Sequence, residues 1–230
     1  MVDHTFVYTG AVQKIRDLVT TGVVGDVYYF DSTRVNLGIF QRDVNVIWDL
    51  AVHDLAILDF VLPANALAIS ATGASHIAGT PENMAHITVY LEGGTTAHLN
   101  VNWLAPVKIR RTLVGGSRRM IVYDDMEPSE KVKVYDRGVD LREAPAVTSS
   151  EEIRQILPDY RMGDVWTPRL GHDEALATGI EHFCHCIEHS QVPLTSGESG
   201  LRVLSLLEGA SRSLRMRGQP VEFGTMRMAS

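Results

Sequence analysis

Hydrophobic residues recur with a helical period in the first part of this chain and with a strand period after Pro63. The apolar positions of residues 12–19 and 48–62 return every three to five residues, which predicts two helices. Residues 27–37 are rich in β-branched and aromatic side chains and residues 2–8 alternate, so both are predicted to be strands. Pro63 ends the second helix because proline lacks the backbone donor that a helix requires.

Beyond Pro63 the apolar positions alternate, as they do in strands with one buried face. The predicted strands are residues 66–77, 85–91, 95–104, 108–114, 120–123 and 131–135. Glycine pairs at 93–94 and 115–116 supply tight turns, so consecutive strands are expected to run antiparallel. Residues 137–171 are polar and interrupted by proline, and we expect them to form a long excursion.

Two helices are predicted at the C-terminal end, at residues 173–189 and 199–217. The second has Thr195 or Ser196 as a cap and Gly218 just past its end. The apolar stripe of the first consists of Leu176, Ile180, Phe183 and Ile187. The expected fold class is α+β, an open and mainly antiparallel sheet with helices packed on one face. The other face also carries apolar residues, so we expect it to form a homo-oligomer.

Composition and charge exclude several classes of function. The chain of 230 residues is 45% hydrophobic, which is ordinary for a globular domain, and its net charge of −7 argues against a nucleic-acid partner. The most apolar stretch, residues 50–69, is interrupted by charges and Pro63, so no membrane span is expected. Residues 1–5 lack the basic-then-apolar pattern of a signal peptide, so none is expected. Cys184 and Cys186 would project in different directions from a helix, which disfavours a disulfide and fits a cytoplasmic protein.

Asp49 and His53 are the strongest candidates for chemistry. They lie four residues apart in the stretch WDLAVHD at residues 48–54 and therefore share one face of the predicted helix. Oxidation of an alcohol needs a base that takes the hydroxyl proton, and a histidine with a carboxylate one turn away suits that task. The alternative is a capping acid and an exposed polar residue, because this spacing is common by chance.

No dinucleotide-binding motif accompanies this pair. Such a fold needs glycines that let the backbone approach a pyrophosphate, usually as GxGxxG. Among the 19 glycines no two are separated by a single residue, and GxxxxGK[ST] does not occur either. We therefore expect no nicotinamide cofactor to be bound by this chain alone.

Several segments in order resemble the Gfo/Idh/MocA oxidoreductase family, and its sugar and nucleotide-sugar branch in particular. They are residues 2–6, 25–29, 31–38, 43–54, 102–110, 200–203 and 211–214. The resemblance implies an N-terminal Rossmann domain followed by a C-terminal domain on an open antiparallel sheet whose free face makes dimers or tetramers. It begins at the last Rossmann strand, so we expect residues 1–24 to be a remnant of that strand and its connecting helix. Residues 25–230 would be the substrate-binding domain, with the Rossmann domain lacking.

The resemblance also assigns roles to individual residues. His53 would be the catalytic acid/base at the substrate oxygen, and Asp49 would assist it. The catalytic lysine of the family's Glu-Lys-Pro motif is missing, because the only Glu-Lys pair, at residues 130–131, is followed by Val132.

Other polar residues lie in segments that border the substrate pocket of the family, where an arginine or lysine would pair with a phosphate or carboxylate. These predicted substrate-binding residues are Arg34, Asn102, Trp103, Lys108 and Arg110. The alternative is that the charges are solvated at strand edges and that Trp103 belongs to the sheet core.

One further cluster has residue types that bind zinc. It consists of His182, His185, Cys186 and His189, which would project within about one third of the helix circumference. The resemblance gives this helix no metal role, so we expect no metal site and treat these four residues only as weak candidates.

The expected function is that of the substrate-binding and oligomerisation domain of an NAD(P)-dependent sugar or nucleotide-sugar oxidoreductase, inactive alone. NAD or NADP would belong to the intact family member, and the partners would be a small sugar or nucleotide-sugar and a second copy of the chain. Two alternatives stay open: a non-enzymatic ligand-binding or scaffold protein derived from the domain, and a subunit that needs a Rossmann partner in trans. The residues do not choose the sugar, its reacting carbon or the preference between NAD and NADP.

Overall fold

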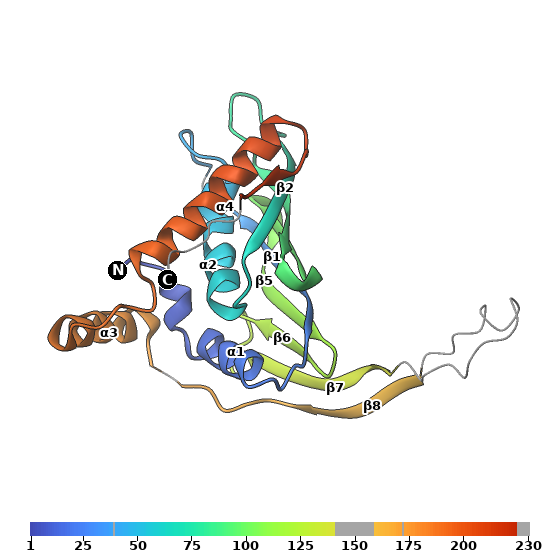
Figure 1. The fold of residues 1–230 in the computed structure, drawn as a ribbon. Helices are drawn as coiled ribbons and strands as arrows, with labels where there is room; N and C mark the ends of the chain where they lie inside the picture. The colour runs from blue at the N-terminus through green and yellow to red at the C-terminus, as the bar shows by residue number, and fades with distance from the viewer. Residues whose placement is uncertain (39, 141–158, 172, 225–230) are drawn as a thin grey trace, which may run out of the picture.

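The computed structural model describes residues 1–38, 40–140, 159–171 and 173–224. These residues form one open sheet with helices packed against it. Its nine described strands lie in the order β8-β7-β6-β5-β1-β4-β3-β2-β9 (Figure 1). They are β1 Val27–Leu37, β2 Ala66–Ala74, β3 Met84–Leu91, β4 Thr96–Asn102, β5 Leu104–Gly116, β6 Met120–Asp124, β7 Val132–Asp140, β8 Asp159–Trp166 and β9 Val221–Glu222. All neighbouring pairs are antiparallel except β1 and β4. The predicted fold class is therefore confirmed.

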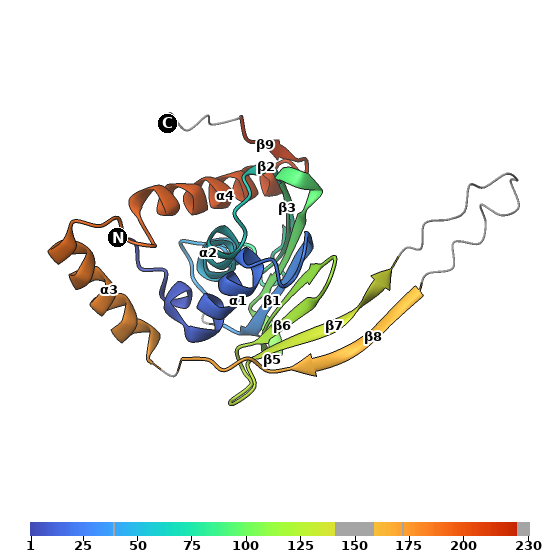
Figure 2. The ribbon, with the colours of Figure 1, turned by 60° about the horizontal axis from the view of Figure 1, so that its bottom comes forward.

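Helices cover one face of this sheet (Figures 1 and 2). They are α1 Gly10–Thr20, a π-helical turn η2 Ile47–Ala51 that leads into α2 Val52–Val61, and α4 Gly197–Arg215. Helix α2 lies between α1, α4 and the sheet, so most of its circumference is apolar and buried. The Ser196 hydroxyl caps α4, as predicted, and Gly218 follows the helix with a φ of 87°, a left-handed conformation that glycine adopts without strain.

Residues 2–8 do not form the predicted strand. They contain a 3-10 helix, η1 Thr5–Tyr8, in which the Val7 amide donates to the His4 carbonyl and the Thr9 amide donates to the Phe6 carbonyl. Alternation misled the prediction here because Val7 and Tyr8, which are adjacent in the chain, are both buried. The proposed domain boundary at residue 24 stays a prediction, although α1 shares its core with α2.

The predicted excursion at residues 137–171 is also partly wrong. Its described part contains the end of β7 and the whole of β8, which pair with each other at the edge of the sheet. Polar residues and glycine suit an edge strand because one side of its backbone stays in solvent. The remainder of that prediction, residues 141–158, lies outside the described residues.

Helix α3, Ala175–His189, confirms the predicted helix, but its apolar stripe is not buried (Figures 1 and 2). The four predicted stripe residues are 44–63% exposed, and the helix contacts η1 through its other side, where Gly179 packs beside Tyr8. Periodicity located the helix, but it could not say what the stripe packs against. Cys184 on this helix is exposed, Cys186 is buried, and both are free thiols, as expected.

The second face of the sheet carries both polar and apolar residues. Thr88 and His98, which lie opposite each other on β3 and β4, are joined by a hydrogen bond of 3.2 Å. Tyr90 and Ile109 are exposed apolar residues. The predicted use of this face in a homo-oligomer stays a prediction. None of the described helices has the length and apolar character needed to cross a membrane.

Candidate functional site

The stretch WDLAVHD lies where the π-helical turn η2 meets α2, so Asp49 is in η2 and His53 is the second residue of α2. The Asn45 side chain accepts hydrogen bonds from the amides of Ile47 and Trp48, which fixes the start of the turn. The Trp48 indole donates to the Ser211 hydroxyl of α4 at 2.8 Å. Single π-helical turns are often found at functional sites because they re-aim the side chains that they carry.

Ser211→Ala tests whether this tie between η2 and α4 matters. We expect the free energy of unfolding to fall by about 1 kcal/mol, because the partly buried Trp48 indole loses its acceptor. Urea unfolding followed by tryptophan fluorescence would measure it. The matched control is Ser205→Ala on the same helix, since the exposed Ser205 hydroxyl bonds only to the Leu201 carbonyl. Equal costs for the two variants would contradict this role of Ser211.

Beside His53, Arg34 and Asp54 form a buried ion pair. Arg34 Nε lies 2.6 Å from Asp54 Oδ2, Arg34 Nη2 lies 3.1 Å from Oδ1, and both residues are less than 5% exposed. The Ser32 hydroxyl donates to the same carboxylate at 2.8 Å. Asp54 was missed by the sequence analysis. Its signal was present, because a carboxylate in a helix with an apolar circumference needs a buried partner.

A second group of charges adjoins this pair on the same sheet. Arg110 of β5 is directly opposite Arg34 of β1 and lies 3.4 Å from Asp125. Asp125 also binds Lys131 at 3.0 Å and accepts a hydrogen bond from the Tyr123 hydroxyl at 3.1 Å. Burial and the Asp125 carboxylate raise the pKa of Tyr123, so its phenol stays protonated. Tyr123, Asp125 and Lys131 were not among the predicted site residues.

His53 carries a neutral imidazole at neutral pH. Its pKa is lowered to about 4, first by burial and then by the Arg34 and Arg110 guanidinium groups, whose effect exceeds the opposite effect of Asp54 and Asp49. The only ring contact described for it is with Phe6 of η1, edge to face at 5.2 Å between centroids. A neutral imidazole can accept a proton, which is the first requirement of the predicted base.

The Asp49 side chain is held by Trp103. Its carboxylate accepts a hydrogen bond of 2.8 Å from the Trp103 indole, and the contacts described for it do not include His53. Trp103 is fully buried, packs edge to face on Phe40 and leaves no room for a side chain on Gly38. The structure therefore places Trp103 in the core, where it positions Asp49.

The remaining predicted residues are more scattered. Asn102 ends β4 and accepts a hydrogen bond from the Leu104 amide at 2.6 Å, while Lys108 is exposed on β5. Among the predicted site residues the structure thus brings together Arg34, Asp49, His53, Trp103 and Arg110. Whether any of them contacts a substrate stays a prediction.

On α3 the four weak metal candidates form two separate contacts. His182 Nε2 lies 3.5 Å from Cys186 Sγ and accepts the Leu194 amide at 3.0 Å, while His185 stacks on His189. Within the described ranges no three histidine, cysteine or acidic residues are grouped as metal ligands would be.

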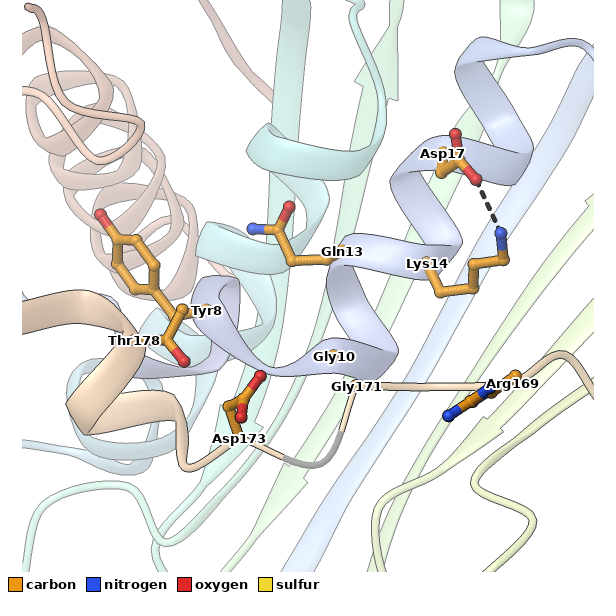
Figure 3. Close-up of a pocket in the computed structure, with 9 residues that line it drawn as sticks. All are labelled: Tyr8, Gly10, Gln13, Lys14, Asp17, Arg169, Gly171, Asp173 and Thr178. Carbon is orange, nitrogen blue, oxygen red and sulfur yellow. Dashed lines mark hydrogen bonds and ion pairs between the residues drawn. The ribbon is translucent and has the colours of Figure 1, made fainter. Parts of the chain in front are cut away.

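Two hollows open on the described surface, and His53 lines neither of them. One of about 370 Å³ lies between α1 and the segment before α3, with Lys14, Arg169 and Asp173 in its wall (Figure 3). Lys14 is already paired with Asp17 at 2.8 Å. The other, of about 440 Å³, has mainly apolar walls that include Trp48 and Val52. The charged cluster around His53 therefore lies outside both of these hollows.

Known proteins resemble this chain in sequence and in fold. The family model described as the GFO/IDH/MocA C-terminal domain matches residues 12–122, which include His53, Arg34 and Arg110. The inositol 2-dehydrogenase of Rhizobium meliloti (strain 1021) is 22% identical over 220 residues, covering 89% of this chain and 59% of that protein.

Solved structures share the fold. The UDP-N-acetylglucosamine 3-dehydrogenase of Acidithiobacillus ferrooxidans matches with a TM-score of 0.70 and 20% identity, over 93% of this chain and 60% of that one. An oxidoreductase from Agrobacterium radiobacter in complex with NAD+, L-tartaric acid and magnesium matches with a TM-score of 0.71 and 18% identity, over 98% and 65%. The chain spans about three fifths of the length of these relatives. The matched segment, residues 12–122, is a C-terminal domain of the GFO/IDH/MocA family.

Proposed function

We propose that this domain binds a sugar or nucleotide-sugar beside His53, as the substrate-binding part of an NAD(P)-dependent oxidoreductase. The observation that carries the proposal is the neutral imidazole of His53, set among Arg34, Arg110 and Asp49 within the segment that the family model matches. The relatives support the substrate class, since the names of two of them specify inositol and UDP-N-acetylglucosamine.

In this proposal His53 transfers the proton. Its unprotonated ring nitrogen accepts the proton of a substrate hydroxyl as the carbonyl forms, and in the reverse direction the imidazolium returns it. The nearby Asp49 carboxylate, fixed by Trp103, stabilises the imidazolium while it exists. Asp49 acts here by charge, because its hydrogen bond is made to Trp103.

The described residues do not fit a dinucleotide. A dinucleotide fold uses a parallel sheet with a glycine-rich turn at a helix N-terminus, whereas the described sheet has one parallel pair and the sequence has no GxG. These residues therefore supply substrate binding and proton transfer. Turnover requires a nicotinamide-binding domain in addition, so this domain alone is expected to be inactive.

Binding of a sugar should be visible at the His53 ring. We expect myo-inositol or UDP-N-acetylglucosamine at millimolar concentration to shift the imidazole NMR signals of His53, and the exposed His98 on the other sheet face to be unaffected. His53→Gln identifies the signals. NAD+ or NADP+ at the same concentration should give neither a shift nor heat in calorimetry. Unchanged His53 signals with every sugar would overturn the substrate-binding proposal, and micromolar affinity for a nicotinamide would overturn the statement about the cofactor.

A second candidate is a subunit that works with a nicotinamide-binding partner in trans. The exposed stripe of α3 favours it, because a monomeric domain rarely leaves four large apolar residues of one helix in solvent. The sheet face that carries Tyr90 and Ile109 stays our proposed surface for a homo-oligomer. Size measurement by sedimentation, with and without a family member's Rossmann domain added, separates the two assemblies.

A further inference from the structure

Arg34 and Arg110 are an unusual pair because two cations lie directly opposite each other on neighbouring strands. Like charges in this position destabilise a sheet unless other groups compensate them. Asp54 compensates Arg34 at 2.6 Å, but Asp125 is 3.4 Å from Arg110 and closer, at 3.0 Å, to Lys131. Three cations thus share two carboxylates, and the remaining carboxylate near His53, Asp49, is hydrogen-bonded to Trp103.

Each of these arginines also has a buried donor without an acceptor. Nη1 of Arg34 and Nε of Arg110 are inaccessible to solvent and make no hydrogen bond. Arg34 as a whole is only 4% exposed, so water cannot satisfy its free N–H groups without a rearrangement. Buried donors are nearly always paired because leaving one unpaired is costly, and two in opposed guanidinium groups indicate a missing acceptor.

The ring of Phe6 lies where such an acceptor would have to arrive. Its centroid is 4.5 Å from Cζ of Arg34 and 5.6 Å from Cζ of Arg110, and its contact with His53 is 5.2 Å. A ring face attracts guanidinium groups, but it cannot accept the directional hydrogen bonds that an oxyanion accepts. Phe6 is only partly buried, whereas the adjacent Val7 and Tyr8 are buried, so the ring can turn away while η1 stays anchored.

We propose that Arg34 and Arg110 form a subsite for an anionic group of the substrate, a carboxylate or a phosphate, and that Phe6 occupies this subsite until the substrate displaces it. The inference rests on the proposed function, since it names the substrate class of the same site. One oxygen of the anion accepts from Arg34 Nη1 and another from Arg110 Nε. The substrate is then a sugar acid or a phosphorylated sugar, with its neutral part beside His53.

The test compares glucuronate, glucose 1-phosphate and glucose by calorimetry on the whole chain. We expect Phe6→Ala to bind one of the two anionic ligands about tenfold more tightly than the wild type, and Arg110→Gln to bind it about tenfold more weakly, with glucose unaffected by either change. Whether glucuronate or glucose 1-phosphate responds decides between carboxylate and phosphate. Arg34 is left intact, because its removal would leave Asp54 unpaired in the core.

Arg111→Gln is the matched control, since Arg111 is the next residue of β5, is exposed and pairs with Asp124 at 3.2 Å. It should bind all three ligands as the wild type does. An independent readout is the pKa of His53, which should rise when the anion neutralises the two arginines and stay unchanged with glucose. If Arg110→Gln and Phe6→Ala bind the anions as the wild type does while glucose still shifts the His53 signals, the subsite is refuted and the proposed function stands. If no sugar of any charge binds, both are refuted.

Discussion

Asp54→Ala is expected to lower the free energy of unfolding by about 3–5 kcal/mol, the cost of leaving one member of a buried ion pair without its partner. Asp54 is 2% exposed, and its carboxylate receives both the Arg34 guanidinium and the Ser32 hydroxyl. Without it, the Arg34 charge stays in the core beside an unfilled space. Urea unfolding followed by tryptophan fluorescence and circular dichroism would give the change, with an unaltered slope showing that the native and unfolded states stay comparable.

Two comparisons separate burial from charge in this prediction. Asp17→Ala removes an ion pair with Lys14 that is exposed in solvent, and it should cost less than about 1 kcal/mol. The double variant Arg34→Met, Asp54→Leu removes both charges together, and it should recover most of the stability lost by Asp54→Ala, because it leaves no unpaired ion. A loss of under about 1 kcal/mol for Asp54→Ala would show that the Arg34 charge reaches water.

The sequence predicted elements better than it predicted their environments. The apolar spacing located α1, α2, α3 and α4, since side chains three and four residues apart share a helix face whatever that face meets. It predicted a buried stripe on α3, but the structure leaves Phe183 and Ile187 exposed. Periodicity records only that a face is apolar. The partner of that face is a property of three-dimensional packing, which the pattern does not contain.

The candidate site shows the same limit in its residues. The sequence predicted Arg34 and Arg110 through the resemblance alone, and it predicted His53 and Asp49 from their spacing with the help of the resemblance. Their arrangement in space could not be predicted. In the sheet β1 lies between β4 and β5, and this strand order cannot be read from the turns in the amino-acid sequence. Phe6 was missed since residues 2–8 were predicted to be a strand. Asp54 was not predicted, because the sequence analysis paired its neighbour His53 with Asp49, one helical turn earlier.

Acidification is expected to destabilise the protein through His53. Its pKa is about 4 in the folded state against 6.5 when unfolded, so between these values the unfolded chain binds more protons than the folded one. Stability from this group is therefore fully present above pH 6.5 and is lost as the pH falls toward 4. Between pH 7 and pH 4.5 the loss should be about 2 kcal/mol.

His53→Gln should remove this part of the pH dependence, while His98→Gln, a change of an exposed histidine, should retain it. The buried His4, whose pKa is also lowered by burial, acts with the same sign in all three proteins and cancels in the comparison. An NMR titration of the His53 ring should have its midpoint near 4. A midpoint at 6.5 or above would mean that solvent or Asp49 stabilises the imidazolium already in the resting protein. The folded and unfolded states would then bind the His53 proton at the same pH or the folded state more tightly, and the expected loss of stability between pH 7 and pH 4.5 would be absent.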